Sequence, residues 1–209
     1  MVIPTDRLAA FVELFAQRLH EAREELTQLD SAIGDADHGI NMDRGFSAVN
    51  GELAGLRDGA AGALFKKVGM TLISTVGGAS GPLYGTFFLR LGTALGDSTE
   101  VTPEQLVAAL RAGLDGVVAR GKAELGDKTM VDAMTPAVVA LEEGVGGDLA
   151  AALDAAAVAA AEGRDRVTPL VARKGRASYL GERAAGHQDP GATSTTLLFE
   201  ALRDALRAS

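Results

Sequence analysis

Apolar residues recur at helical spacing along nearly the whole chain. They first alternate steps of four and three positions, at Leu8, Val12, Phe15, Leu19, Ala22, Leu26 and Leu29. This spacing predicts one helix, which Thr5 or Asp6 can cap and which ends near Asp30. The spacing returns over 42–53, 64–76, 83–95, 106–117, 130–145, 148–161 and 195–206. No run alternates apolar and polar residues for long enough to make a sheet. We therefore expect an all-α fold, an up-and-down barrel or bundle of about eight antiparallel helices.

Four further features of the sequence refine the expected fold and function. Thr102 followed by Pro103 and Gln105 predicts a capped helix start. With 209 residues and no linker, the chain is expected to form one domain over residues 1–209. The lack of cysteine excludes disulfides, thiolate metal sites and a cysteine nucleophile. A net charge of −8 with 4% aromatic residues argues against nucleic acid as a partner.

One stretch, residues 68–89, carries no charge and needs to be weighed as a membrane span. Glycines and Pro82 interrupt it, and a helix broken there would expose backbone groups to lipid. The start of the chain has no basic region followed by an apolar core, as a signal peptide would have. We expect no membrane association and a cytoplasmic location.

Three carboxylates, Asp30, Asp35 and Asp37, lie within eight residues and are flanked by glycines. Unpaired carboxylates this close repel one another, so a bound cation is expected. Ligand sets made only of oxygen select Mg²⁺, Mn²⁺ or Ca²⁺. An EF-hand loop is excluded because its fifth and twelfth positions would fall on Gly39 and Phe46. Mg²⁺ leaves coordination positions for phosphate oxygens, which points to a nucleotide; the alternative is a polar loop whose aspartates cap helices.

A glycine-rich turn, residues 77–82, precedes a predicted helix. Backbone N–H groups at such a place can bind an anion, although an ordinary turn between helices has the same composition. Residues 116–123 nearly match a phosphate-binding P-loop, but Ala123 stands where that loop needs a hydroxyl. No strand precedes a glycine motif, so any nucleotide site here is neither a P-loop nor a Rossmann site.

Residues 164–183 hold six basic residues against two acidic ones. Arginine binds phosphate oxygens well. A solvated loop, or a surface that binds an acidic partner, would have the same composition. Asp189-Pro190-Gly191 is typical of a turn before the last helix. His38 and His187 stand alone in polar loops and are expected to form hydrogen bonds rather than act as nucleophiles or metal ligands.

The polar segments 30–41, 77–82, 121–130 and 173–194 each lie between predicted helices. Alternate links of an up-and-down bundle lie at the same end, so these segments can converge on one site.

Four motifs in order, 34–42, 126–132, 173–183 and 186–194, resemble one family. That family is the nucleotide-binding L subunit of dihydroxyacetone kinase, which also forms the C-terminal domain of single-chain dihydroxyacetone kinases. The resemblance covers essentially the whole chain. It implies a phosphotransferase whose eight antiparallel helices form a barrel with the nucleotide at one rim.

The resemblance also implies which residues bind metal and nucleotide. Asp30, Asp35 and Asp37 match carboxylates that bind two Mg²⁺ ions bridging to the phosphates of ADP or ATP. The nucleotide-binding positions match His38, Gly39, Ile40, Asn41, Ala79, Ser80, Gly121, Met130, Arg176, Asp189, Pro190 and Gly191. Gly126 could serve instead of Gly121, and Arg173 instead of Arg176. The family often has glycine where this chain has Ala36, and no functional consequence is expected.

The family's chemistry is divided between chains. A separate K subunit holds dihydroxyacetone covalently on a histidine, as a hemiaminal. In one variant a phosphohistidine M subunit of the phosphotransferase system rephosphorylates bound ADP; in the other, ATP exchanges. A chain with no K-like domain favours the variant with the M subunit. The alternatives are a kinase subunit for erythrulose or a fatty acid, or a non-catalytic regulatory paralogue, and a homodimer is left open.

Overall fold

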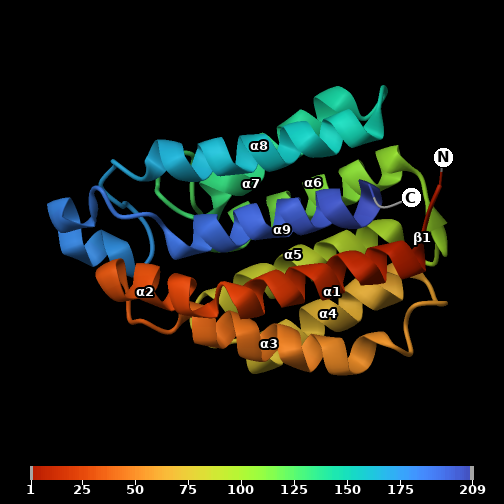
Figure 1. The fold of residues 1–209 in the computed structure, drawn as a ribbon, viewed down its shortest axis with the longest axis horizontal. Helices are drawn as coiled ribbons and strands as arrows, with labels where there is room; N and C mark the ends of the chain where they lie inside the picture. Colours follow the sequence, from red (N-terminus) through yellow and green to blue (C-terminus); the bar gives the residue numbers. More distant parts are fainter. Residues whose placement is uncertain (1, 208–209) are drawn as a thin grey trace.

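The protein is built almost entirely of helices in a computed structural model that describes residues 2–207 (Figure 1). The α-helices are α1 (Thr5–Glu21), α2 (Arg23–Ile33), α3 (His38–Leu53), α4 (Ala61–Thr75), α5 (Ser80–Leu95), α6 (Pro103–Gly121), α7 (Met130–Gly144), α8 (Leu149–Val167) and α9 (Pro190–Arg207). A 3₁₀ helix, η1 (Arg176–Ala184), precedes α9. The strands β1 (Ile3–Pro4) and β2 (Glu100–Val101) form one antiparallel pair, with Ile3 opposite Val101. The all-α prediction is confirmed.

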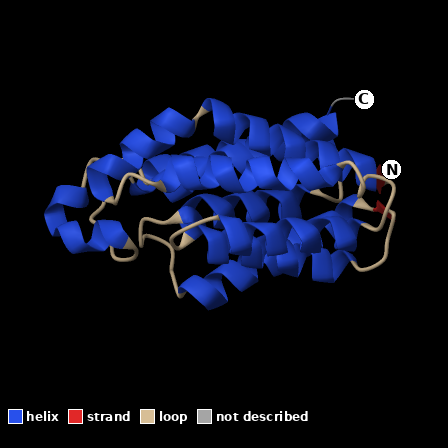
Figure 2. Ribbon diagram, turned by 90° about the horizontal axis from the view of Figure 1, so that it is seen from below, coloured by secondary structure: helices blue, strands red, loops and turns tan. Residues whose placement is uncertain are grey.

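Eight of these helices close into a ring. Each of α3 to α8 packs against the next helix, α1 packs against α3, and α9 packs back against α1. The remaining helix, α2, extends beyond the end of α1, where it packs against α3, α9 and η1 (Figure 1). The view in Figure 2 shows long helices whose axes are roughly aligned, with the connecting loops gathered at the two ends of the molecule. The predicted barrel of about eight helices is therefore present.

The first predicted helix is bent. Ala22, with φ −89° and ψ 6°, separates α1 from α2. The backbone hydrogen bonds continue through the bend, because Ala22 N–H donates to the Arg18 carbonyl and Leu26 N–H donates to the Ala22 carbonyl, both at 2.9 Å. The expectation that the helix ends near Asp30 is wrong, because α2 continues to Ile33 and carries Asp30 in its last turn.

Of the two predicted helix caps, one is present and the other is not. Thr102 and Gln105 form the expected reciprocal cap, in which the Thr102 N–H donates to Gln105 Oε1 at 2.8 Å. The cap expected at Thr5 or Asp6 is wrong, because no side chain caps α1. The Thr5 hydroxyl instead donates to the Thr99 carbonyl at 2.9 Å and ties the start of α1 to the segment before β2.

Aromatic side chains fill the ring, and glycines let its helices approach closely. Phe15 and Phe46 meet edge to face, with ring centroids 4.7 Å apart. A Cβ on Gly62 of α4 would lie 2.1 Å from the carbonyl of Gly96 at the end of α5. Such close packing makes the ring a rigid support for the loops at its ends. Within residues 2–207, no helix is both long enough and apolar enough to cross a membrane.

The four links that follow α2, α4, α6 and α8 lie at one end of the ring, away from the N and C termini (Figure 1). They correspond to the four polar segments of the sequence. One pocket is lined by residues from all four, so the expected convergence of alternate links is confirmed.

Candidate functional site

Asp30 is held in place by the start of the next helix. Its side chain is 8% exposed, and Oδ2 accepts the N–H groups of Asp37 at 2.8 Å and His38 at 3.1 Å. These bonds satisfy donors at the start of α3, as a helix cap does, and fix the carboxylate. Gly34 makes room for it, since a Cβ there would lie 2.0 Å from Asp30 Oδ1.

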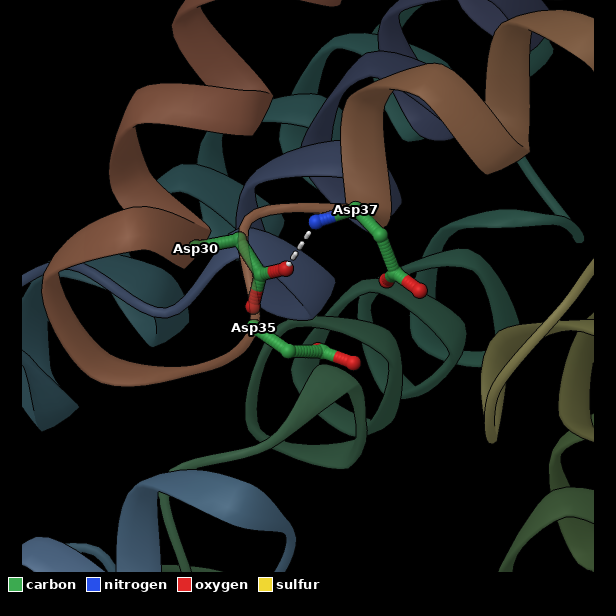
Figure 3. Close-up of side chains that lie close together, drawn as sticks. All are labelled: Asp30, Asp35 and Asp37. Carbon is green, nitrogen blue, oxygen red and sulfur yellow. Dashed lines mark hydrogen bonds between the residues drawn. The ribbon is translucent and has the colours of Figure 1, made fainter.

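Asp35 and Asp37 lie on the loop between α2 and α3, beside Asp30 (Figure 3). One oxygen from each of the three carboxylates lies within 4.8 Å of the others. Ala36, between them, has a φ of 61°, a left-handed conformation that costs a residue with a Cβ about 1–2 kcal/mol. This conformation gives a physical reason for glycine at the matching position of the family.

The donor set of this cluster fits a hard divalent cation such as Mg²⁺. Asp35 forms an ion pair with Arg176, with Oδ2 and Nη2 at 2.9 Å, whereas Asp30 and Asp37 form none within residues 2–207. Three carboxylates with one exposed arginine retain an excess of negative charge at close range. The alternative that these aspartates only cap helices explains Asp30, but it does not explain Asp35 and Asp37.

His38 is buried in a network of hydroxyl groups. Its Nδ1 lies 3.0 Å from Ser80 Oγ and its Nε2 lies 3.0 Å from Ser194 Oγ, which also lies 2.7 Å from the Tyr84 hydroxyl. Burial lowers the pKa of His38 to about 4, against the raising effect of Asp30. His38 is therefore neutral near pH 7 and ties the starts of α3, α5 and α9 together, as expected of a hydrogen-bonding histidine.

The glycine-rich turn lies directly beside this network. Gly78 has a φ of 65°, and α5 begins at Ser80. The Asn41 side chain supports the turn, because a Cβ on Gly77 would lie 3.1 Å from its amide nitrogen. Arg44 in turn donates to Asn41 Oδ1 at 2.7 Å. The turn thus presents backbone at the start of a helix, next to the carboxylates, where an anion is favoured.

Asp189 and Lys128 also line the pocket. Burial raises the pKa of Asp189 to about 7, although Oδ2 accepts the Ala192 N–H at 2.7 Å. The charges of Asp132 and Asp30 raise this pKa further, and that of Lys128 lowers it. The interpretation of residues 189–191 as a turn is wrong, because Pro190 begins α9 and Asp189 caps it.

The basic segment, residues 164–183, is not a single solvated loop. Arg164 and Arg166 lie in the last turn of α8, away from the pocket. Lys174 and Arg176 line the pocket from the segment that leads into η1, and Arg176 reaches Asp35. Arg173 instead pairs with Asp127, with Nε and Oδ1 at 2.9 Å.

The structure gathers most of the expected site residues in this one pocket. Those that line it are Asp30, Asp35, Asp37, His38, Ala79, Ser80, Met130, Arg176, Asp189, Pro190 and Gly191. Four expected nucleotide-binding residues lie outside the lining. Gly39 packs against α2, where a Cβ would lie 2.0 Å from the Arg23 carbonyl, and Ile40 is 49% exposed. Asn41 lies behind the glycine-rich turn, and Gly121 lies behind Leu83.

Lys128 and Tyr84 are among the lining residues that the sequence did not predict as part of the site. Lys128 and Tyr84 are each 1% exposed, and atoms of both contribute to the lining of the pocket. Lys128 stands inside the 126–132 motif, which was a usable signal. Tyr84 has no sequence signal, because its partners Ser194 and Thr195 are more than a hundred residues away.

Known proteins resemble this chain over most of its length. The DAK2 domain family matches residues 32–204. The chain is 51% identical over 181 residues to the ADP-binding subunit DhaL of the PEP-dependent dihydroxyacetone kinase of Escherichia coli (strain K12), covering 86% of each chain. It is also 36% identical over 206 residues to a D-erythrulose kinase of Mycolicibacterium smegmatis, covering 97% of this chain but 36% of that one.

A solved structure shares the fold. The crystal structure of the dihydroxyacetone kinase from C. freundii in complex with AMP-PNP and Mg²⁺ matches with a TM-score of 0.73 and 30% identity. The match covers 94% of this chain and 33% of the kinase, so the chain spans about a third of that protein.

Proposed function

Because the chain belongs to the DAK2 domain family, we propose that it is the nucleotide-binding subunit of a dihydroxyacetone kinase. The observation that carries the proposal is the convergence of three carboxylates, a glycine-rich helix start and an arginine in one pocket. These are the parts that in-line phosphoryl transfer requires. The relative that is covered over 86% of its length is named as an ADP-binding subunit, which supports this role for the chain.

Each part of the pocket has a role in this proposal. Asp30, Asp35 and Asp37 hold Mg²⁺, two ions in the proposal, which neutralises phosphate charge and orients the transferred group. Backbone N–H groups at Ala79 and Ser80 bind phosphate oxygens, and residues 189–191 with Met130 contact the rest of the nucleotide. Neutral His38 keeps Ser80 in position by the hydrogen bond to Nδ1. Gly39, Ile40, Asn41 and Gly121 lie outside the lining of the pocket, and they are proposed as nucleotide-binding residues on the resemblance alone.

The acceptor is proposed to be dihydroxyacetone held covalently on a histidine of a separate K subunit. A phosphohistidine M subunit would rephosphorylate the bound ADP, all in the cytoplasm. Similarity to a D-erythrulose kinase, of which the chain covers 36%, keeps a related ketose as the second proposed acceptor.

The purified chain with ATP, Mg²⁺ and dihydroxyacetone is expected to form no phosphorylated product, because it lacks the subunit that holds the ketone. Addition of a K subunit is expected to start turnover, measured by coupled assay of the product. Robust turnover by the chain alone would contradict the division of the active site.

The phosphoryl donor is tested by mass spectrometry of the protein purified without chelator. Retained ADP supports rephosphorylation in place by the M subunit. Protein that arrives empty and binds ATP reversibly supports ATP exchange instead.

Replacement of Arg176 by alanine is expected to weaken Mg²⁺–ADP binding by about 1.5–3 kcal/mol, the typical value of a hydrogen bond to a charged group. Its guanidinium reaches Asp35, beside the proposed phosphate position. Lys174→Ala is the comparison variant and is expected to lose less affinity, since Lys174 also lines the pocket but is exposed and forms no hydrogen bond or ion pair within residues 2–207. Calorimetric titration measures the Mg²⁺–ADP affinity of both variants. An equal or larger loss of affinity in Lys174→Ala would mean that Arg176 is not the residue that contacts the phosphate.

A further inference from the structure

A lysine beside an anion pocket normally offers its ammonium group to the anion, but Lys128 does not. Its Nζ donates to three backbone carbonyls: Thr168 at 2.8 Å, Leu170 at 2.9 Å and Ala184 at 2.6 Å. An ammonium group has three hydrogens, so every donor is committed. The side chain is 1% exposed. Lys128 therefore has no donor left for a phosphate oxygen.

The three carbonyls belong to one stretch of chain, residues 168–186, which we call the cap segment. It leaves the end of α8, passes Lys174 and Arg176, forms η1 and leads back toward α9. Lys128 forms hydrogen bonds to this segment near both of its ends, at Thr168 and at Ala184. The ammonium also lies at the carbonyl end of α8, where a positive charge is favoured.

The apolar attachment of the cap segment is small. Its buried cluster consists of Ile33, Ala172, Ala177 and Ala184, with Leu180 partly buried against it. Three of the four buried members are alanines, so little apolar area holds the segment to α2. A buried charge with three hydrogen bonds is then a large share of what fixes the segment in place.

The neighbouring residue adds a second attachment in the middle of the segment. The Arg173 N–H donates to the Asp127 carbonyl at 3.0 Å, and the side chains of these two residues form an ion pair. The two adjacent residues 127 and 128 thus hold the segment at 168, 170, 173 and 184. Arg176 lies between these attachments along the chain and forms an ion pair with Asp35.

From this geometry we propose that Lys128 is a positioning residue, which holds the cap segment so that Arg176 faces the metal and phosphate site. The inference rests on the proposed function for its consequence in nucleotide binding. The attachment itself exists without nucleotide and can be measured separately.

The test is Lys128→Met, which keeps the length of the side chain and removes the charge and the donors. In the nucleotide-free protein, amide hydrogen exchange over residues 168–186 is expected to accelerate at least tenfold, while the amides of α4 and α5 keep their protection. Lys66→Met, at an exposed position of α4, is the matched control and is expected to change neither. Unchanged exchange in the cap segment of Lys128→Met would overturn the inference.

A double-mutant cycle separates positioning from general weakening of the fold. Lys128→Met is expected to lower Mg²⁺–ADP affinity about as much as Arg176→Ala, and the double variant is expected to be no weaker than either one. Additive losses would overturn the inference, because they would mean that Lys128 acts independently of Arg176. If Lys128→Met does not fold, Lys128→Gln, which keeps two donors, is measured in the same way and is expected to show smaller changes in the same direction.

The two proposals fail in different ways. Wild-type protein that binds no Mg²⁺–ADP would contradict the proposed function, and the exchange measurement would still test the role of Lys128. Wild-type binding with an unperturbed cap segment in Lys128→Met would contradict the positioning role alone.

Discussion

Asp37→Asn is expected to lower the affinity for ADP in the presence of Mg²⁺ by a factor of roughly 100 or more, above the 10–100-fold typical of residues that only support metal ligands. The amide keeps the shape of the carboxylate but loses the charge that holds the cation. The nucleotide phosphates would then face Asp30 and Asp35 with weakened metal bridging, so repulsion replaces attraction. Calorimetric titration of ADP with and without Mg²⁺ measures the loss.

The same substitution is expected to leave the metal-free fold intact. Asp37 has no ion pair within residues 2–207, and its contact with Asp30 is made by its backbone N–H, which asparagine retains. Removal of one charge from a cluster spanning 4.8 Å relieves repulsion, so the melting temperature should hold or rise slightly. Asp37 is a cleaner test than Asp35, whose replacement also removes the ion pair with Arg176.

The control is Asp58→Asn, which changes an exposed acid in the loop between α3 and α4, at the opposite end of the ring. It should change neither ADP affinity nor stability. A collapse of stability in Asp37→Asn with ADP binding preserved would mean that these aspartates only cap helices, and the proposed metal site would be wrong.

The ring of helices was predictable because each helix buries one apolar face, and that face appears in the sequence as steps of three and four. The bend at Ala22 was not predictable in this way, since the apolar spacing and the backbone hydrogen bonds both continue through it. The 3₁₀ helix η1 was missed for a different reason. Its buried anchors are mainly alanines, Ala177 and Ala184, which leave no apolar period to detect.

The convergence of the four polar segments was predictable from chain topology alone, because alternate links of an up-and-down bundle share an end. The detailed contacts were not. His38 meets Ser194 across 156 positions of sequence, and Lys128 binds backbone carbonyls, which carry no residue-specific signal. The start of α9 was misread because an Asp-Pro-Gly sequence fits both a turn and a capped helix with proline in its first turn.

Gly34→Ala is expected to disable the carboxylate cluster without removing any charge. The new Cβ would lie 2.0 Å from Asp30 Oδ1 and 2.9 Å from its carboxyl carbon, so the Asp30 side chain must move. That movement breaks the hydrogen bonds from the N–H groups of Asp37 and His38, a cap worth about 1 kcal/mol. We expect Mg²⁺-dependent ADP affinity to fall at least tenfold, about 1.4 kcal/mol, with a modest loss of thermal stability.

Gly51→Ala makes the same chemical change where there is room for it. Gly51 lies in α3, is exposed, and would have no atom within 4 Å of an added Cβ. Alanine is favoured over glycine inside a helix by about 1 kcal/mol, so this variant should melt higher and bind ADP as the wild type does. Wild-type Mg²⁺-dependent binding in Gly34→Ala would show that the position of Asp30 does not matter to the metal, and that Asp35 and Asp37 hold it without Asp30.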